Sequence, residues 1–280
     1  MIPSERSAGA AGPVGLIAGK GSLPVAIAEG VRRHGRPVIC INVYDADPLL
    51  GRLADASYTV PLGELGGLIA ALRRHGVREV LLAGKVDKIA AMESARLDAV
   101  GLQAAGRMTD FRDASILGAL VAVLEEAGLT VADQTRYIGH LLPAAGVLGA
   151  RAPSPEELRD IDLGRRVAAG VAALDIGQAV AVRRGVIVAV EAAEGTDAMI
   201  RRAGTLAPGL VVVKVSRPRQ DPRYDLPVVG AQTIEALAAS SGTALAVEAG
   251  RTILVERDRL VAAADALGVA VVAVTAQPDA

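Results

Sequence analysis

The sequence is poor in aromatic residues and in cysteine. Aromatic side chains make up 2% of the 280 residues, with one Phe, four Tyr and no Trp, while hydrophobic residues make up 51%. These proportions predict an aliphatic core and leave few rings on which nucleic-acid bases could stack. Cys40 is the single cysteine, so an intrachain disulfide is excluded. A lone thiol among apolar neighbours indicates a buried Cys40 and is typical of the reducing cytoplasm.

The sequence also lacks an excess of either charge and long hydrophobic runs. The chain has 30 basic and 31 acidic residues, which gives a formal net charge of −1. This balance offers no basic surface for a phosphate backbone, so we expect no nucleic-acid partner. No run approaches the roughly 18 apolar residues that a membrane-spanning helix needs. The three histidines have no metal-binding spacing and do not predict a zinc site.

Lysine is scarce relative to arginine. Four of the 30 basic residues are lysines, namely Lys20, Lys85, Lys88 and Lys214. All except Lys88 lie at or just beyond the ends of predicted strands. Ligands of open α/β sheets collect outside the carboxyl ends of the strands, so these three lysines are candidates for contact with an anionic ligand.

The first half of the chain alternates between strand-like and helix-like segments. Short apolar runs predict strands at residues 14–18, 37–43, 56–60, 79–83 and 129–132, and amphipathic stretches predict helices at 23–33, 64–75 and 115–127. This alternation is typical of βαβ units. We therefore predict an α/β fold whose N-terminal domain, residues 13–138, is Rossmann-like and contains a parallel sheet.

The second half begins with a segment rich in Gly, Ala and Pro, which predicts a linker at residues 139–155. Ser154 and Pro155 predict a helix start, and a mixed α/β C-terminal domain is expected at 156–280. We expect the strands at 244–247 and 252–255 to pair. The other predicted elements are strands at 179–182, 186–190, 210–215 and 269–274, and helices at 196–203, 231–239 and 257–267.

Gly19-Lys20-Gly21 joins a predicted strand to a predicted helix. Glycines let a backbone approach a ligand, and a helix N-terminus favours an anion, although an ordinary strand-to-helix turn fits the same residues. The spacing is not that of a dinucleotide fingerprint, because Pro24 stands where the third glycine is required. A nicotinamide-dependent reductase stays open as an alternative, with Asp45 the acid nearest to the end of the second strand.

Polar residues follow three further predicted strands. Lys85 is placed to meet an anionic group, and Gln134 could read a uracil or amide edge, whereas a solvated loop and a surface turn are the respective alternatives. Gly195 or Thr196 could cap a helix whose free N–H groups hold a phosphate. Asp197 is explained equally well as an acid that complements the helix dipole.

A proline-rich loop after a predicted buried strand carries several charges. Asp221 and Asp225 could ligate Mg²⁺, which prefers carboxylates and substrate phosphate oxygens. Lys214 and Arg223 could neutralise phosphate charge. A solvated charged loop is the alternative interpretation.

Five motifs are spread over both halves of the chain. They are Gly15-Leu16-Ile17-Ala18-Gly19-Lys20-Gly21-Ser22-Leu23-Pro24, Gly84-Lys85-Val86, Glu194-Gly195-Thr196-Asp197-Ala198-Met199-Ile200, Lys214-Val215-Ser216 and Gln220-Asp221-Pro222-Arg223-Tyr224-Asp225-Leu226-Pro227. Together they resemble the bacterial UDP-2,3-diacylglucosamine pyrophosphatases of the LpxI type over residues 13–275. The resemblance implies a Rossmann-like N-terminal domain, an α/β C-terminal domain and a ligand between them.

The resemblance also implies a reaction and its site. The family hydrolyses UDP-2,3-diacylglucosamine to 2,3-diacylglucosamine 1-phosphate (lipid X) and UMP in lipid A biosynthesis, with Mg²⁺ or another divalent cation. Asp225, Lys214 and Arg223 are then the expected catalytic residues, and Asp225 and Asp221 the expected metal ligands. The expected substrate contacts are Gly19, Lys20, Gly21, Lys85, Gln134, Gly195, Thr196, Asp197 and Gln220.

The implied substrate is a nucleotide sugar that carries acyl chains. We therefore expect a cytoplasmic protein that contacts the inner membrane peripherally, and a homodimer is compatible with the sequence. Two alternatives of other classes stay open, namely the nicotinamide-dependent reductase and a non-catalytic nucleotide-sugar binding protein.

Overall fold

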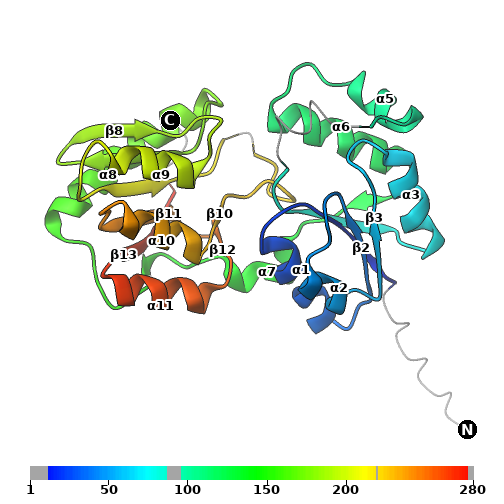
Figure 1. Cartoon of the computed structure of the whole chain (residues 1–280), viewed down its shortest axis with the longest axis horizontal. Helices are drawn as coiled ribbons and strands as arrows, with labels where there is room; N and C mark the ends of the chain where they lie inside the picture. The colour runs from blue at the N-terminus through cyan, green and yellow to red at the C-terminus, as the bar shows by residue number, and fades with distance from the viewer. Residues whose placement is uncertain (1–11, 87–95, 219, 277–280) are drawn as a thin grey trace, which may run out of the picture. The chain divides into compact units, whose positions relative to one another are not determined.

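The structure is a computed structural model that describes residues 12–86, 96–218 and 220–276 (Figure 1). Lys88 lies outside these ranges. The chain divides between Ile138 and Gly139 into two compact units, which are described separately.

The first unit contains a parallel five-stranded sheet in the order β3-β2-β1-β4-β5. Its strands are β1 (Val14–Ala18), β2 (Val38–Asn42), β3 (Ala56–Thr59), β4 (Glu79–Ala83) and β5 (Thr130–Val131). Every residue of β1 and β2 is buried. Because neighbouring side chains of a strand point to opposite faces, both faces of the sheet centre are covered. The predicted α/β fold class with a parallel sheet is confirmed.

Six described helices surround this sheet. They are α1 (Leu23–Arg33), α2 (Pro48–Leu53), α3 (Leu65–Arg74), α5 (Ala99–Ala105), α6 (Asp113–Glu126) and α7 (Thr135–Ile138). Helices α1, α2 and α7 form one group, and α3, α5 and α6 form another (Figure 1). Helix α1 buries Leu23, Ile27 and Val31, which are spaced four residues apart and so share one side of the helix.

Cys40 is buried in β2, as its apolar neighbours predict. Its thiol donates a hydrogen bond to Asn42 Oδ1 over 3.4 Å. Burial raises the pKa of the Cys40 thiol to about 12, because a thiolate loses its hydration in the core. Cys40 is therefore a packing residue rather than a nucleophile.

The second unit contains a mixed six-stranded sheet in the order β6-β13-β11-β9-β7-β8. Its strands are β6 (Gly146–Val147), β7 (Ala179–Arg183), β8 (Val186–Val190), β9 (Val211–Lys214), β11 (Ala244–Glu248) and β13 (Ala270–Val274). Strands β9, β11 and β13 are mutually parallel, while β7, β8 and β6 join by antiparallel pairing. The mixed α/β character predicted for this half is confirmed.

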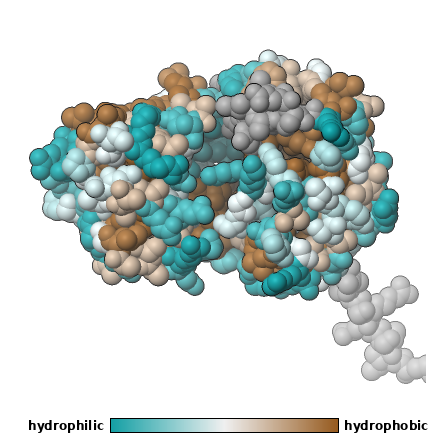
Figure 2. Space-filling model, in the orientation of Figure 1, coloured by the Kyte–Doolittle hydropathy of each residue, from teal (hydrophilic) through white to brown (hydrophobic). Residues whose placement is uncertain are grey.

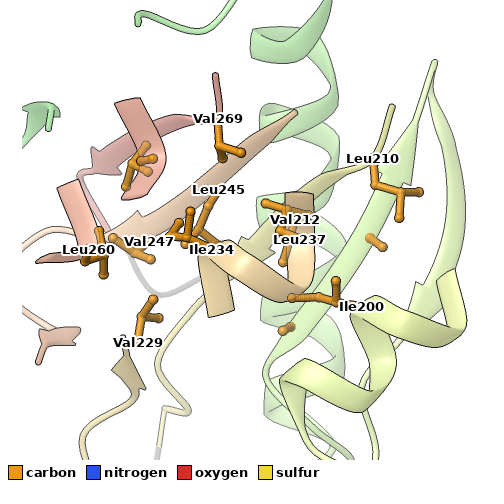
Figure 3. Close-up of a cluster of buried hydrophobic side chains, with 14 of the residues drawn as sticks. Ile200, Leu210, Val212, Val229, Ile234, Leu237, Leu245, Val247, Leu260 and Val269 are labelled. Carbon is orange, nitrogen blue, oxygen red and sulfur yellow. The ribbon is translucent and has the colours of Figure 1, made fainter. Parts of the chain in front are cut away.

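Helices cover both faces of the second sheet. Val211 and Val213 of β9 pack in a cluster with α8 (Pro155–Ala173). Val212 packs on the opposite face in a cluster with α9 (Thr196–Gly204), α10 (Ala231–Ala239) and α11 (Arg257–Leu267) (Figure 3). Both clusters are built from aliphatic side chains and one methionine, Met199, in agreement with the scarcity of aromatics.

One predicted strand pairing is wrong. The strand at 252–255 is β12 (Ile253–Leu254), and it pairs in parallel with β10 (Val228–Val229) rather than with β11. The physical reason is that β9 and β13 occupy both edges of β11, so no backbone groups of β11 remain for β12.

The segment at 139–155 contains regular structure. It forms a 3₁₀ turn at Gly139–Leu141 and the edge strand β6, whose Val147 is opposite Val272 of β13. Its last residues also contribute to the start of α8. Arg151 Nη2 donates to Glu157 Oε1 over 2.6 Å, and Ser154 and Glu157 form a reciprocal capping box.

Glu157 is an ionised carboxylate in a nearly buried position. Burial opposes its ionisation, but hydrogen bonds from Arg151 and from the Ser154 backbone outweigh this and lower the pKa of Glu157 to about 2. A carboxyl group whose pKa is lower in the folded protein stabilises the fold above its ordinary pKa. That stabilisation is lost as the pH falls from about 4.5 towards about 2.

Replacing Glu157 by Gln is expected to destabilise the fold by about 3 kcal/mol near neutral pH, because the lowered pKa corresponds to that free energy. The difference between variant and wild type should shrink as the pH falls through the acidic range. Urea unfolding followed at several pH values measures it. Glu156→Gln is the matched control, because Glu156 makes exposed ion pairs with Arg183 and Arg184. A deficit for Glu157→Gln that is the same at all pH values would contradict the prediction.

The described surface mixes polar and apolar residues. Figure 2 shows hydrophilic areas interrupted by smaller hydrophobic ones on the face that it draws. Single exposed hydrophobic side chains are ordinary on protein surfaces. Among the helices of the described ranges, none combines the length and apolar character needed to cross a bilayer.

Candidate functional site

The turns that follow β1 and β4 are joined by backbone hydrogen bonds. Lys20 N donates to Lys85 O over 2.9 Å, and Lys85 N donates to Lys20 O over 2.8 Å. A Cβ on Gly19 would lie 2.6 Å from Lys85 O, and one on Gly84 would lie 2.7 Å from the carbonyl carbon of Gly19. These two glycines therefore permit a close approach between the turns. The structure thus brings predicted site residues Gly19, Lys20 and Lys85 together.

A cavity of about 210 Å³ opens at the carboxyl ends of β1 and β2. Its lining includes Gly19, Lys20 and Gly21 of the glycine turn, together with Asn42 and Tyr44. Lys20 Nζ lies 4.5 Å from the centre of the Tyr44 ring, within the range of a cation–π interaction. Gly21 has a φ of +97°, and no atom lies within 4 Å of where its Cβ would be. A glycine is therefore required at position 21 by the backbone conformation and not by close packing.

Gln134 lies beyond β5, and its side chain is completely buried. Neither Oε1 nor Nε2 has a hydrogen-bond partner within the described part of the chain. A buried amide without partners is unfavourable by roughly 1–3 kcal/mol. Because the side chain is inaccessible in this conformation, a ligand could reach it only after its surroundings move. Its predicted role in substrate contact stays a prediction.

A buried lysine ends β9 in the second unit. Lys214 is 7% exposed, and its Nζ donates to Thr196 Oγ1 over 3.0 Å and to Val228 O over 3.1 Å. Thr196 lies at the start of α9 and is 9% exposed. Two residues predicted from separate motifs are therefore in direct contact.

A buried carboxylate continues this hydrogen-bonded series. Thr196 Oγ1 donates to Glu191 Oε1 over 2.8 Å, and Gln178 N donates to Glu191 Oε2 over 3.1 Å. Glu191 follows β8 and is 6% exposed. Gly195, with a φ of +82°, turns the chain between Glu191 and α9. Sequence motifs alone do not single out Glu191, although an acid directly after an apolar strand is a usable signal.

Asp197 joins two helices. Thr233 Oγ1 at the start of α10 donates to Asp197 Oδ1 over 2.9 Å. Asp197 also occupies the first turn of α9, where a negative charge complements the helix dipole. These contacts give Asp197 a structural role, and its predicted substrate contact stays a prediction.

The charged loop after β9 contains an ion pair between Arg223 and Asp221. Arg223 Nη2 donates to Asp221 Oδ2 over 2.8 Å, and Arg223 Nε lies 3.1 Å from each Asp221 oxygen. The Arg223 hydrogen bonds lower the pKa of Asp221 and so keep it ionised. Gln220 Oε1 accepts a hydrogen bond from Arg217 N over 3.0 Å. The pairing means that a metal ion at Asp221 and a phosphate at Arg223 would each compete with the partner side chain.

Asp225 lies on the same turn as Asp221. Its backbone N donates to Asp221 O over 3.0 Å. The described ranges hold no group of three or more His, Cys, Asp or Glu side chains that could bind a metal ion. Mg²⁺ commonly takes only one or two protein carboxylates and completes its shell with water and substrate phosphate oxygens. The two carboxylates of this loop therefore fit a cation that is shared with a substrate.

Two solved structures are distantly similar to this chain. Glycinamide-RNase-transformylase T from Mycobacterium tuberculosis is 20% identical, covers 64% of this chain and 44% of that one, and has a TM-score of 0.24. UDP-glucose-4-epimerase from Stenotrophomonas maltophila is 15% identical, covers 52% of this chain and 40% of that one, and has a TM-score of 0.26. This chain thus spans less than half of either protein, and scores this low support no argument.

Sequence comparison gives a close relationship. The family model described as the LpxI N-terminal domain matches residues 13–141, and the LpxI C-terminal domain model matches residues 144–272. A Caulobacter vibrioides protein named UDP-2,3-diacylglucosamine pyrophosphatase LpxI is 37% identical over an alignment 279 positions long, and the alignment covers 94% of this chain and 98% of that protein. With both domain models matched and more than a third of the aligned residues identical, this chain belongs to the LpxI family.

Proposed function

We propose that this protein hydrolyses UDP-2,3-diacylglucosamine to lipid X and UMP in lipid A biosynthesis. The observation that carries the proposal is the 37% identity, over 94% of the chain, to a protein named for this pyrophosphatase activity. The buried lysine of the second unit supports it, because pyrophosphate cleavage requires positive charge near the reacting phosphorus.

Lys214 is the group that we assign to the phosphate oxygens. It is held at the end of β9 by Thr196 and the Val228 carbonyl, so its ammonium is fixed before a substrate arrives. A charge fixed in advance needs little reorganisation during the reaction, which makes it effective in stabilising a transition state. Arg223 would join it by exchanging its contact with Asp221 for a substrate phosphate.

Asp225, with Asp221, is the residue that would hold a divalent cation such as Mg²⁺. The cation would supply positive charge to the pyrophosphate oxygens when it is bound. In the hydrolysis, a water oxygen forms a bond to phosphorus and the bridging oxygen leaves with the other phosphate. The ionised state of Asp221 suits it to keep a cation near the loop.

The remaining predicted contacts would bind the rest of the substrate. In the first unit, Lys20 and Gly21 line the cavity beyond β1 and β2, and Lys85 is bonded to that turn. The scarcity of aromatic residues favours recognition of uracil by polar groups rather than by stacking. A substrate with two acyl chains favours peripheral contact with the cytoplasmic face of the inner membrane, and a homodimer is compatible with the proposal.

A UMP-release assay tests the proposal. Purified protein is incubated with UDP-2,3-diacylglucosamine and Mg²⁺, with and without a chelator, and both products are measured. Release of UMP and lipid X in equal amounts, lost on chelation and restored by excess Mg²⁺, is the expected result. Binding of the substrate without product release would instead favour a nucleotide-sugar binding protein. Carrying out the reaction in ¹⁸O-labelled water identifies which phosphorus water attacks.

A further inference from the structure

Three buried polar side chains form a continuous hydrogen-bonded series in the second unit. Glu191, Thr196 and Lys214 are each less than one-tenth exposed, and hydrogen bonds of 2.8 Å and 3.0 Å connect them. They come from the end of β8, the start of α9 and the end of β9. The series therefore depends on three separate elements and not on one local motif.

Glu191 differs from the other buried glutamate described above. Glu157 is paired directly with the Arg151 guanidinium, which compensates the loss of hydration of its charge. Within the described part of the chain, Glu191 instead accepts one hydrogen bond from a hydroxyl and one from a backbone amide. The Thr196 hydroxyl lies between the Glu191 carboxylate and the Lys214 ammonium and is hydrogen-bonded to both. A carboxylate buried in this way is costly if its only role is packing.

We propose that Glu191 is a positioning residue that orients the Lys214 ammonium through the Thr196 hydroxyl. The inference rests on the proposed function of Lys214 as the group that meets the phosphate. A hydroxyl has one proton to donate, and Thr196 donates it to Glu191. The lone pairs of Thr196 Oγ1 are thereby turned towards Lys214 Nζ.

The hydroxyl between the two charges has a chemical consequence. A lysine side chain is a flexible four-carbon stem, so holding its ammonium in one place requires dedicated partners. Thr196 Oγ1 and the Val228 carbonyl oxygen are two such partners. The hydrogen bond to Glu191 fixes the orientation of the first of them, and an ammonium fixed in advance is effective in stabilising developing phosphate charge.

Variants of Glu191 and Thr196 test the inference in the UMP-release assay. Glu191→Gln and Thr196→Val are expected to lower kcat by about 10- to 100-fold with little change in KM, because a hydrogen bond to a charged partner is lost. Thr196→Ser retains the hydroxyl and is expected to recover most of the activity that Thr196→Val loses. Glu194→Gln is the matched control, because Glu194 is exposed in the same loop and pairs with Arg202.

A spectroscopic readout makes the test independent of turnover. The chain has only four lysines, so lysine-selective ¹⁵N labelling gives few ammonium signals, and Lys214→Arg identifies one of them by its loss. A buried, hydrogen-bonded ammonium exchanges its protons slowly with water and should give a resolved signal. That signal is expected to weaken or shift in Glu191→Gln and Thr196→Val, and to persist in Glu194→Gln.

The outcomes separate this inference from the proposed function. If Glu191→Gln retains wild-type kcat and an unchanged Lys214 signal while Lys214→Met has a strongly lowered kcat, the inference is wrong and the proposed function stands. The inference is also overturned if Glu191→Gln changes only KM. It is overturned as well if Thr196→Ser loses as much activity as Thr196→Val does. If the wild-type protein releases no UMP, the proposed function fails, and the ammonium signal alone decides whether Glu191 orients Lys214.

Discussion

Replacing Lys214 by Met is expected to lower kcat for UMP release by about 10²- to 10³-fold, the loss typical when one preorganised donor to a developing charge is removed. Methionine has a similar length and no charge, so it retains much of the packing at the end of β9. The positive charge that Thr196 and the Val228 carbonyl hold in place is then missing. Steady-state kinetics measured with saturating Mg²⁺ give the effect on kcat and KM separately.

Lys214→Arg sharpens this prediction, because it keeps the charge and changes its geometry. A planar guanidinium does not fit contacts built for a compact ammonium, so kcat is expected to fall for this variant as well. Arg201→Met is the matched control, because Arg201 is an exposed residue of α9. Wild-type turnover in Lys214→Met would contradict the assignment of Lys214 to the phosphate oxygens.

Replacing Asp225 by Ala is expected to lower kcat by about 10³-fold or more, because a bound cation contributes several kcal/mol of charge stabilisation in such reactions. Asp225 lies on one turn with Asp221, and Asp221 is already paired with Arg223. Because the resemblance implies that Asp225 is both a catalytic residue and a metal ligand, it is the carboxylate of this loop with the larger expected effect. UMP release is measured over a range of Mg²⁺ concentrations.

Two further variants check the role of Asp225. Asp225→Asn retains the shape of the side chain and one oxygen, so it is expected to need more Mg²⁺ for half-maximal activity than the wild type does. Asp162→Ala is the control, because Asp162 makes an exposed ion pair with Arg166 on α8. If Asp225→Ala retains wild-type turnover with supplemented Mg²⁺, Asp225 is not a metal ligand in this reaction.

Local signals in the sequence suffice for the longer helices. Helix α8 begins at Pro155 after the Ser154 cap, and α1 covers the same residues as its amphipathic pattern, 23–33. Capping and helical periodicity act within a few residues of one another, so neighbouring residues determine them. The apolar strands of both sheets are predictable for a similar reason, because strands that are buried on both faces are short, nearly continuous runs of apolar residues.

Helices α2, α5 and α7 and strand β10 escape prediction, because distant contacts hold them. Helix α5 has seven residues and is capped by Asp98, which also accepts a hydrogen bond from Gly66 N over 2.7 Å. Helices α2 and α7 have six and four residues, too few for a clear period. Strand β12 is held by β10, which is a two-residue strand without a pattern of its own. Helices this short are marginal without tertiary packing.

For the candidate site, the sequence identifies residues, whereas the tertiary structure decides the contacts between them. Sequence motifs identify Lys20, Lys85, Thr196 and Lys214 as candidates, but do not say which of them meet. The backbone bridge between Lys20 and Lys85 follows from the adjacency of β1 and β4. The contact between Thr196 and Lys214 requires α9 to begin beside the end of β9. Sheet order therefore selects the partners.

By itself, the sequence determines an aliphatic α/β protein with a buried cysteine, its longer helices and strands, and motifs that resemble the LpxI type. Only the tertiary structure decides that Thr196 lies between Glu191 and Lys214, that Asp221 is paired with Arg223, and that the buried Gln134 amide has no hydrogen-bond partner among the described residues. The physical reason is the separation along the chain of the residues that determine each feature. Helix periodicity and strand burial are encoded in adjacent residues, whereas the partner of a buried polar group depends on which distant loops the sheet brings to one edge.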